Sequence, residues 1–485
     1  MQDSKNLKNL RSGSDIRGIA IGDNINLTND TVKNISMAFL KFLKKEKNIE
    51  IKNQTIAIGH DSRISGERLK DIFINSIISA GANVYYCGLC STPAMSMAPK
   101  ILSCTASVEI TASHHPKEYN GFKFFTPDGG LTPIDIEEIL DIASNEFYPK
   151  SFTQGIVHKI NLMKKYSEIL KNMIKKEFNE KFPLENLKII IDASNGAGGF
   201  FADILKKLGA DISGSSLLNP DGNFPVHSPN PENNQAINYI KKIAIKNKAD
   251  LGIIFDADVD RCFFIDEKGN ILSKNKFIAL VSKLILKKYP GSVIVTDSVT
   301  SENLKIFIEK NGGYQFREKR GYQNVISAAK YMNKDKKICF LAIETSGHAA
   351  LEENNFKDDG AYLAIKIIIE TVKLKKQNKK LSDIISDFKD AKETKEIRIS
   401  CKTKEQIEAK IKNLKNNYKR ILGCNIDENT PEGIRLNFNL KDRKGCCLLR
   451  PSAHDLSLVL NIESDIKNGT EKILRDISIF DVDDN

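Results

Sequence analysis

Three aspartates stand at alternate positions after the apolar run "LGIIF", and Arg261 follows them directly: Asp256, Asp258 and Asp260. Mg²⁺ commonly joins a few carboxylates to a phosphate oxygen. The spacing also begins a calcium loop of the EF-hand type, but the sixth position of such a loop needs Gly and is Arg261 here, and a strand pattern precedes it. A solvated acidic turn is the remaining alternative. We interpret the triad as a site for one Mg²⁺ per chain, with Arg261 facing a phosphate.

A serine and two histidines stand in "EITASHHPKEYNGFKFF" (Glu109 to Phe125). A serine after a strand most often caps a helix or closes a turn, because its hydroxyl is a weak nucleophile. Beside a divalent ion it can instead carry a phosphoryl group whose charge the ion and basic side chains balance. On this hypothesis Ser113 carries the phosphate and contributes to the metal site, His114 orients it, and Lys123 meets the substrate. His115 has no assigned role and is expected at the surface.

Two further polar loops have the side chains of a sugar phosphate site. In "ETSGH", Glu344, Ser346 and His348 are two residues apart, so on an extended segment they would project to one side and bind vicinal sugar hydroxyls. In "RPSAHD", Arg450 and Ser452 would hold a distal phosphate, since the guanidinium offers a bidentate fork. Each loop alone is also typical of an ordinary polar turn. Four such loops in one chain favour a shared binding site.

An internal repeat predicts how these loops are positioned. Three stretches each carry a β-branched run that reaches an Asp and continues into a helical pattern: residues 55–66, 188–199 and 292–303. Each is followed by a Gly-led second strand, after Gly81, Gly209 and Gly312, and then by a third apolar run that ends at one of the loops. Alternating strands and helices indicate α/β domains, whose ligands bind at the strand ends.

The predicted fold class is therefore α/β, with three related α/β domains that have mixed sheets and a smaller C-terminal α+β domain, arranged around one central cleft. We place the domains at residues 1–157, 158–270, 271–387 and 388–485, named for the serine, metal, sugar and phosphate loops. The 485-residue length agrees with several domains.

Composition narrows the classes of partner. The net charge is +11, but the lysines alternate with acids along the chain and there is no Trp, so we expect solvated helix faces and anionic small molecules rather than nucleic acid. Nine scattered cysteines indicate reduced thiols. Cys87 and Cys90 have the spacing of a redox or half-zinc motif without a second pair. No apolar run reaches the roughly 18 residues of a membrane span, and the N-terminus lacks a signal-like stretch, so we expect a cytoplasmic protein with no membrane partner.

The four loops, in this order, resemble the active-site loops of the α-D-phosphohexomutase superfamily, which includes phosphoglucomutase and phosphomannomutase. The resemblance extends from "GSDIRGIA" to "RPSAHD". It implies a phosphoserine at Ser113, Mg²⁺ on the three aspartates, and sugar contacts from Glu344 and Ser346. It also implies that Arg17, Arg63, Lys123 and Arg261 are basic active-site or supporting residues and that Arg450 and Ser452 bind the substrate's phosphate. His454, where relatives tend to have Thr, either donates to that phosphate or caps the loop.

The resemblance implies a mutase that interconverts hexose 1-phosphate and hexose 6-phosphate, of glucose or mannose or both. Phospho-Ser113 would donate its phosphoryl group to the sugar, and the resulting hexose 1,6-bisphosphate, which is the intermediate and also the activator, would return its other phosphoryl group. Lys123 or His348 would move the hydroxyl proton. Phosphoglucosamine mutase, a sugar-bisphosphate synthase of the same fold and a sugar-phosphate-binding regulatory pseudoenzyme are the alternatives. Ser14 and Tyr322 depart from the family pattern at substrate-contact positions, so the sugar stays open. We expect a monomer or homodimer.

Overall fold

The computed structural model describes residues 7–145, 153–452 and 456–478. The chain forms two compact units. The first contains residues 1–272 and 357–382, and the second contains residues 273–356 and 383–485. In the described part of the chain, no helix is long and apolar enough to cross a membrane.

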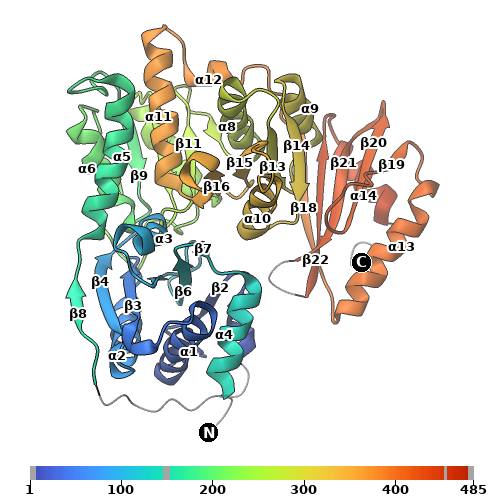
Figure 1. The fold of residues 1–485 in the computed structure, drawn as a ribbon. Coiled ribbons are helices and arrows are strands. Elements are labelled where there is room, and N and C mark those ends of the chain that lie inside the picture. Colours follow the sequence, from blue (N-terminus) through green and yellow to red (C-terminus); the bar gives the residue numbers. More distant parts are fainter. Residues whose placement is uncertain (1–6, 146–152, 453–455, 479–485) are drawn as a thin grey trace. The chain divides into compact units, whose positions relative to one another are not determined.

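The first unit begins with a mixed sheet in the order β1-β2-β6-β5-β3-β4-β8, with β7 paired to β6. Its strands are β1 (Arg11–Ser12), β2 (Asp15–Ile19), β3 (Thr55–His60), β4 (Asn83–Leu89), β5 (Ala106–Ile110), β6 (Tyr119–Thr126), β7 (Gly129–Gly130) and β8 (Val157–Lys159). Four helices accompany it: α1 (Asn29–Lys47), α2 (Gly66–Ser79), α3 (Thr92–Ile101) and α4 (Pro133–Asn145). In Figure 1, α1, α2 and α4 gather on one side of this sheet and α3 on the other. The core between them contains Phe39, Phe73, Phe122 and Phe124.

A second sheet of the first unit has the order β12-β11-β10-β9. Its strands are β9 (Ile189–Asp192), β10 (Leu251–Phe255), β11 (Cys262–Ile265) and β12 (Ile271–Leu272). The accompanying helices are α5 (Leu162–Phe178), α6 (Phe200–Lys207), α7 (Asn234–Lys246) and α11 (Gly360–Lys376). The short strand β17 (Lys357–Asp358) and the start of α12 (Leu381–Ile384) also belong to the first unit. Both β9 and β10 are buried along their whole length, as expected for apolar strands covered on both faces. The long helix α11 packs against α5, β10 and β11.

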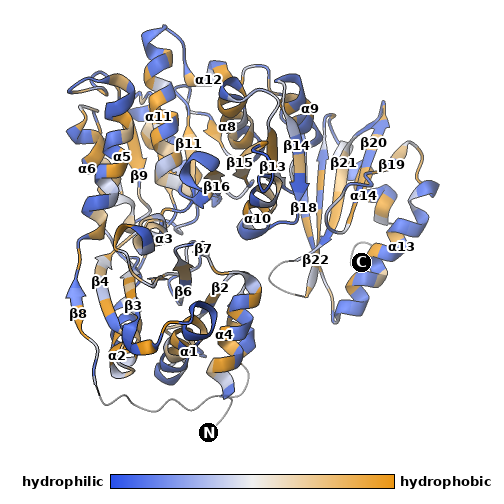
Figure 2. Cartoon of the chain, viewed as in Figure 1, coloured by the Kyte–Doolittle hydropathy of each residue, from blue (hydrophilic) through white to orange (hydrophobic). Residues whose placement is uncertain are grey.

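The second unit contains a sheet built on β14-β13-β15-β16 and an antiparallel sheet in the order β18-β22-β21-β20-β19. The first has β13 (Val293–Asp297), β14 (Tyr314–Glu318), β15 (Cys339–Ile343), β16 (Ala349–Leu351), α8 (Lys274–Lys288), α9 (Glu302–Lys310) and α10 (Tyr322–Met332). The other has β18 (Glu393–Ser400), β19 (Cys424–Ile426), β20 (Ile434–Leu440), β21 (Arg443–Pro451), β22 (Ser457–Ser464), α13 (Lys404–Asn417) and α14 (Gly469–Ser478). Helix α13 buries Ile407 and Leu414 and is otherwise largely hydrophilic (Figure 2).

The three copies of the sequence repeat form the same pattern of strand pairing. In each copy the first strand pairs in parallel with the third, and the third pairs antiparallel with the strand after its loop: β3, β5 and β6; β9, β10 and β11; β13, β15 and β16. The predicted fold class, three related α/β domains with mixed sheets and a smaller C-terminal domain, is confirmed. The second strand of the middle copy is the exception. It is reduced to two isolated parallel bridges, at Asp211 and Ser216, because the chain turns at Gly214, whose φ is +98°.

Candidate active site

Ser113 lies in the tight loop between β5 and β6 and is buried. Its φ is +50°, a left-handed conformation that is uncommon for a residue other than glycine. The Thr111 hydroxyl accepts a hydrogen bond from the Ser113 backbone N–H at 2.8 Å and itself donates to Asp61 Oδ2 at 2.8 Å. Such a conformation persists only when its surroundings fix it.

Arg63 makes many of the hydrogen bonds that hold the Ser113 backbone in this conformation. Its Nη2 donates to the carbonyls of Ser113 (2.6 Å) and His115 (2.7 Å), and its Nη1 to those of Pro116 (2.7 Å) and Tyr119 (2.9 Å). Its Nε donates to Asp61 Oδ2 at 3.1 Å. One guanidinium therefore satisfies four carbonyls of the serine loop, which suits the planar fork of Arg and not the ammonium of Lys.

The acidic triad follows β10 in a sharp turn. Val259 has a φ of +69°, which is rare for a β-branched side chain. Its carbonyl accepts from the N–H of Gly360 at 3.1 Å, and a Cβ on Gly360 would lie 2.9 Å from that carbonyl oxygen. The contact with α11 thus holds the turn in a shape that brings the oxygens of Asp256, Asp258 and Asp260 within 4.8 Å of one another.

The serine and the triad meet inside the first unit. Ser113 Oγ donates to Asp256 Oδ2 at 2.8 Å and accepts from Arg261 Nη2 at 3.2 Å. Arg261 Nε donates to the same Asp256 oxygen at 3.0 Å, and Nδ1 of the partly buried His114 lies 3.3 Å from Ser113 Oγ. The hydroxyl predicted to carry a phosphate is therefore surrounded by a carboxylate, a guanidinium and an imidazole.

Lys123 and Thr92 occupy the other side of the triad. Lys123 Nζ donates to Asp258 Oδ2 at 2.8 Å and to Asp260 Oδ2. Thr92, at the start of α3, donates its hydroxyl to Asp258 Oδ2 at 2.6 Å and its N–H to the Asp258 carbonyl at 2.9 Å. We predicted that Lys123 contacts a substrate group. In the structure its ammonium contacts the carboxylates of Asp258 and Asp260. The sequence offered no signal for Thr92, which is far from the triad along the chain.

The electrostatics of the triad favour a cation. Burial raises the pKa of Asp256 well above its ordinary value, and the nearby Asp260 and Asp258 raise it further. No group of the described residues donates a hydrogen bond to the buried Asp258 Oδ1. A buried carboxylate oxygen without a donor, beside two further carboxylates, fits a hard divalent ion such as Mg²⁺. These residues therefore could hold a metal.

Two other residues singled out from the sequence, Arg17 and His115, are partly buried and not fully exposed to solvent. Arg17, on β2, pairs with Asp15 at 2.9 Å and is mostly buried. His115 was expected at the surface, but it is partly buried between the rings of His114 and Tyr119. It packs within the loop.

The "ETSGH" segment lies in the second unit and is not extended as predicted. It is a tight turn between β15 and β16, closed by the Glu344 N–H donating to the His348 carbonyl at 2.9 Å and by Gly347 with a φ of +99°. Glu344 accepts from the N–H of Gly321 at 2.7 Å and from the Ser346 hydroxyl at 3.1 Å. The expectation failed because alternation was assumed through a stretch whose Gly permits reversal.

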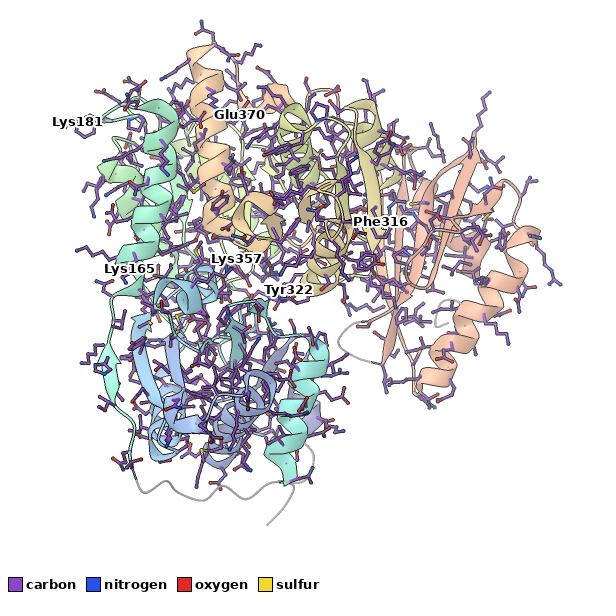
Figure 3. The ribbon with its side chains drawn as sticks, viewed as in Figure 1. Lys165, Lys181, Phe316, Tyr322, Lys357 and Glu370 are labelled. Carbon is purple, nitrogen blue, oxygen red and sulfur yellow. The ribbon has the colours of Figure 1, made fainter. Side chains whose placement is uncertain are left out.

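His348 and Asp297 complete this turn. The His348 ring stacks on the Tyr322 ring, with centroids 5.1 Å apart. Tyr322 lies at the first turn of α10 (Figure 3). Asp297, at the end of β13, accepts from the N–H and hydroxyl of Thr345. Burial and the neighbouring Glu344 raise the pKa of Asp297 to about 7.

The "RPSAHD" segment begins inside β21 rather than in a loop. Arg450 is buried and donates to the Pro451 carbonyl at 3.3 Å, and the Ser452 N–H donates to the Ser457 carbonyl at 2.8 Å. Burial and the nearby Arg320 lower the pKa of Arg450, and Glu432 opposes this shift. Two guanidinium groups thus lie near each other in the second unit. His454 lies outside the described residues.

Comparison with known proteins gives a family for this geometry. Sequence profiles of phosphoglucomutase/phosphomannomutase α/β/α domains I, II and III match residues 8–149, 164–269 and 273–391. The chain belongs to the phosphoglucomutase/phosphomannomutase family. Its members are phosphotransferase-type mutases, and this chain is an enzyme of that type. The predicted resemblance is confirmed.

Similar family members cover most of the chain. A phosphoglucomutase/phosphomannomutase of Thermococcus kodakarensis is 32% identical over 77% of this chain and 78% of its own. A phosphomannomutase of Escherichia coli is 32% identical with the same coverage, and a phosphoglucomutase of Neisseria gonorrhoeae is 29% identical over 95% of this chain and 94% of its own. A solved family structure from Burkholderia thailandensis shares the fold, with a TM-score of 0.82 at 22% identity over 99% of this chain and 97% of that one.

Proposed function

We propose that the chain interconverts hexose 1-phosphate and hexose 6-phosphate through phospho-Ser113 and a bound hexose 1,6-bisphosphate. The observation that carries this proposal is the buried Ser113 hydroxyl, held by Asp256 at 2.8 Å and Arg261 at 3.2 Å. Phosphoryl transfer needs positioning and charge stabilisation more than covalent chemistry, and both are present around this oxygen.

Each residue of the cluster in the first unit has its own role in this proposal. Asp256, Asp258 and Asp260 would hold Mg²⁺, which when bound neutralises charge on the transferring phosphoryl group. Arg261, which donates to Ser113 Oγ, would stabilise the same group, and Arg63 holds Ser113 in place through its carbonyl. Asp256 accepts a hydrogen bond from the Ser113 hydroxyl in the unphosphorylated enzyme. Lys123, whose Nζ lies 2.8 Å from Asp258 Oδ2, is the first candidate for moving the sugar's proton: as the ammonium it donates to the departing sugar oxygen, and as the neutral amine it accepts from the attacking hydroxyl.

The second unit supplies the sugar and phosphate contacts in this proposal. Glu344 and Ser346 hydrogen-bond sugar hydroxyls, and His348 is the second candidate for moving a proton. Arg450 with Ser452 binds the phosphate that is not transferred. Arg17, on β2 of the first unit, is a further substrate-binding residue in this proposal. The proximity of the half-buried Arg320 to the buried Arg450 supports an anion there, because a dianion stabilises two neighbouring guanidinium charges.

The sugar is glucose or mannose in this proposal. A phosphoglucosamine mutase of Thermoanaerobacter, 30% identical over 68% of this chain, makes glucosamine phosphate the second candidate. Solved N-acetylphosphoglucosamine mutases from Aspergillus fumigatus contain GlcNAc-6P with magnesium in one case and glucose 1,6-bisphosphate in another, which supports sugar phosphates as the ligand class.

Two measurements test the proposal. Intact-mass and peptide mass spectrometry of the purified protein should find phosphate on Ser113. A coupled assay with glucose 1-phosphate, mannose 1-phosphate and glucosamine 1-phosphate, each with a trace of hexose 1,6-bisphosphate, should give turnover that Ser113→Ala loses while still binding substrate. A binding protein without catalysis would give no turnover with any of them. Wild-type turnover in Ser113→Ala would remove Ser113 from the mechanism.

A further inference from the structure

Glu109 is a buried carboxyl that the mechanism above does not use. It lies in β5, fully buried, and neither of its carboxyl oxygens has a hydrogen-bond partner among the described residues. Its Oε2 lies 2.7 Å from where a Cβ on Gly59 would stand, so the absence of a side chain on the neighbouring strand β3 makes room for it. Buried polar groups without partners are rare and need an explanation.

The surroundings make this carboxyl unfavourable to ionise unless a cation joins it. Burial raises the pKa of Glu109 well above its ordinary value, and Asp61 and Asp258 raise it further, while Lys123 acts in the opposite direction. The two guanidinium groups of the serine and metal loops are engaged elsewhere, Arg63 with the serine loop and Arg261 with Asp256 and Ser113. Lys123 is the cation that can reach it.

Lys123 is the direct cross-strand neighbour of Glu109 in the antiparallel pair β5 and β6. Opposite side chains on one face of such a pair have Cβ atoms about 5 Å apart, well within the reach of Lys and Glu. The Lys123 ammonium currently contacts Asp258 and Asp260. These are two of the three carboxylates proposed to hold a divalent cation. Two cations cannot share the same oxygens without strong repulsion, so metal binding must move the ammonium.

We propose that Glu109 is the alternate ion-pair partner of Lys123, which moves from Asp258 and Asp260 to Glu109 when a divalent cation occupies the triad. Glu109 is then a positioning residue: it keeps the displaced ammonium beside the reacting phosphate instead of leaving a buried lysine unpaired. This exchange presupposes the metal site proposed above. It gives a role to the carboxyl without a hydrogen-bond partner that lies four residues before Ser113.

The test is the Mg²⁺ affinity of the full-length protein, measured by isothermal titration calorimetry with MgCl₂. Wild type, Glu109→Gln, Lys123→Met and the double variant form a cycle. Glu109→Gln should weaken Mg²⁺ binding roughly tenfold, because the displaced ammonium loses its acceptor. Lys123→Met should bind Mg²⁺ more tightly than wild type, since the competing cation is gone. In that background Glu109→Gln should change the affinity less than about twofold.

The control is Glu232→Gln, which removes another carboxylate near the cluster, 4.0 Å from Arg261, without touching Lys123. It should give the same change of affinity with and without Lys123. An equal loss from Glu109→Gln in both backgrounds would mean that Glu109 acts through its charge alone, and no loss would mean that it does not act; either result overturns the exchange. Absence of Mg²⁺ binding by the wild type would overturn the metal site itself, which separates the two failures.

A crystal structure of the wild type with Mg²⁺ gives a second measurement that does not depend on the folding of any variant. The Lys123 ammonium should lie within hydrogen-bond distance of Glu109 there. An ammonium still in contact with Asp258 beside the bound ion would refute the proposal.

Discussion

Replacing Arg63 by Lys should disable the serine loop while leaving the charge in place. The guanidinium donates five hydrogen bonds, to Asp61 and to the carbonyls of Ser113, His115, Pro116 and Tyr119. An ammonium has three N–H groups on one nitrogen and cannot span acceptors that lie on both sides of a planar fork. At least two of these buried or partly buried acceptors therefore lose the hydrogen bond from residue 63.

The expected size of the effect follows from that count. A buried acceptor left unsatisfied costs about 1–3 kcal/mol, so two of them destabilise the native state by about 2–6 kcal/mol. For a domain of this size the midpoint of thermal unfolding should fall by roughly 5–20 °C. Because Ser113 has a positive φ that only its surroundings maintain, the hydroxyl should also leave its position. A displacement of about 1 Å should lower turnover roughly a hundredfold.

The matched control is Arg68→Lys on the neighbouring helix α2. Arg68 also donates to backbone carbonyls, those of Ala20 (2.8 Å) and Leu27 (3.1 Å), and to the Asn29 side chain, but it does not contact the serine loop. Differential scanning calorimetry and kcat/KM should show a loss for Arg63→Lys well beyond that for Arg68→Lys. Equal unfolding midpoints and equal turnover in the two variants would refute the assignment of Arg63 as the support of the loop.

Three further predictions concern the other loops. Asp258→Asn should lower Mg²⁺ affinity and turnover without unfolding the chain, and Zn²⁺ should substitute poorly in the wild type because all-oxygen ligation suits hard ions; full activity in excess chelator would contradict this. Arg450→Ala should raise KM strongly for every hexose phosphate, since both orientations of the bisphosphate would use the same grip, and a KM change for one sugar alone would exclude that role. Asp297, whose pKa is raised to about 7, holds a proton in the folded state between pH 4 and 7 that the unfolded chain has lost, so its contribution to stability falls as pH rises through 7. Asp297→Asn should therefore gain up to about 4 kcal/mol relative to wild type between pH 4 and 8, measured by urea unfolding, and parallel pH profiles would show that Asp297 does not titrate there.

The strands and loops were predictable because their signals are local. A β-branched run that ends in Asp, as at Asp61, Asp192 and Asp297, predicts a buried strand and its end within a dozen residues. The proposed metal site and the serine proposed to carry phosphate were predictable for the same reason, from the spacing of Asp256, Asp258 and Asp260 and from the adjacent Ser113 and His114. The turn at "ETSGH" was missed because its reversal depends on one Gly with a positive φ, which alternation does not reveal. The domain boundaries stay a prediction.

The sequence by itself determined which residue types stand at the ends of which strands, and through them the fold class and the family. Tertiary structure alone decided which side chains hold those residues in place. Arg63 lies 50 residues before Ser113, Thr92 lies 166 residues before Asp258, and Lys123 lies 135 residues before the same aspartate. Hydrogen bonds and ion pairs of this range form only when separate strands and helices meet, so no local pattern records them. The same holds for Glu109. Its carboxyl loses water and is left without a hydrogen-bond partner only when the sheet packs around it.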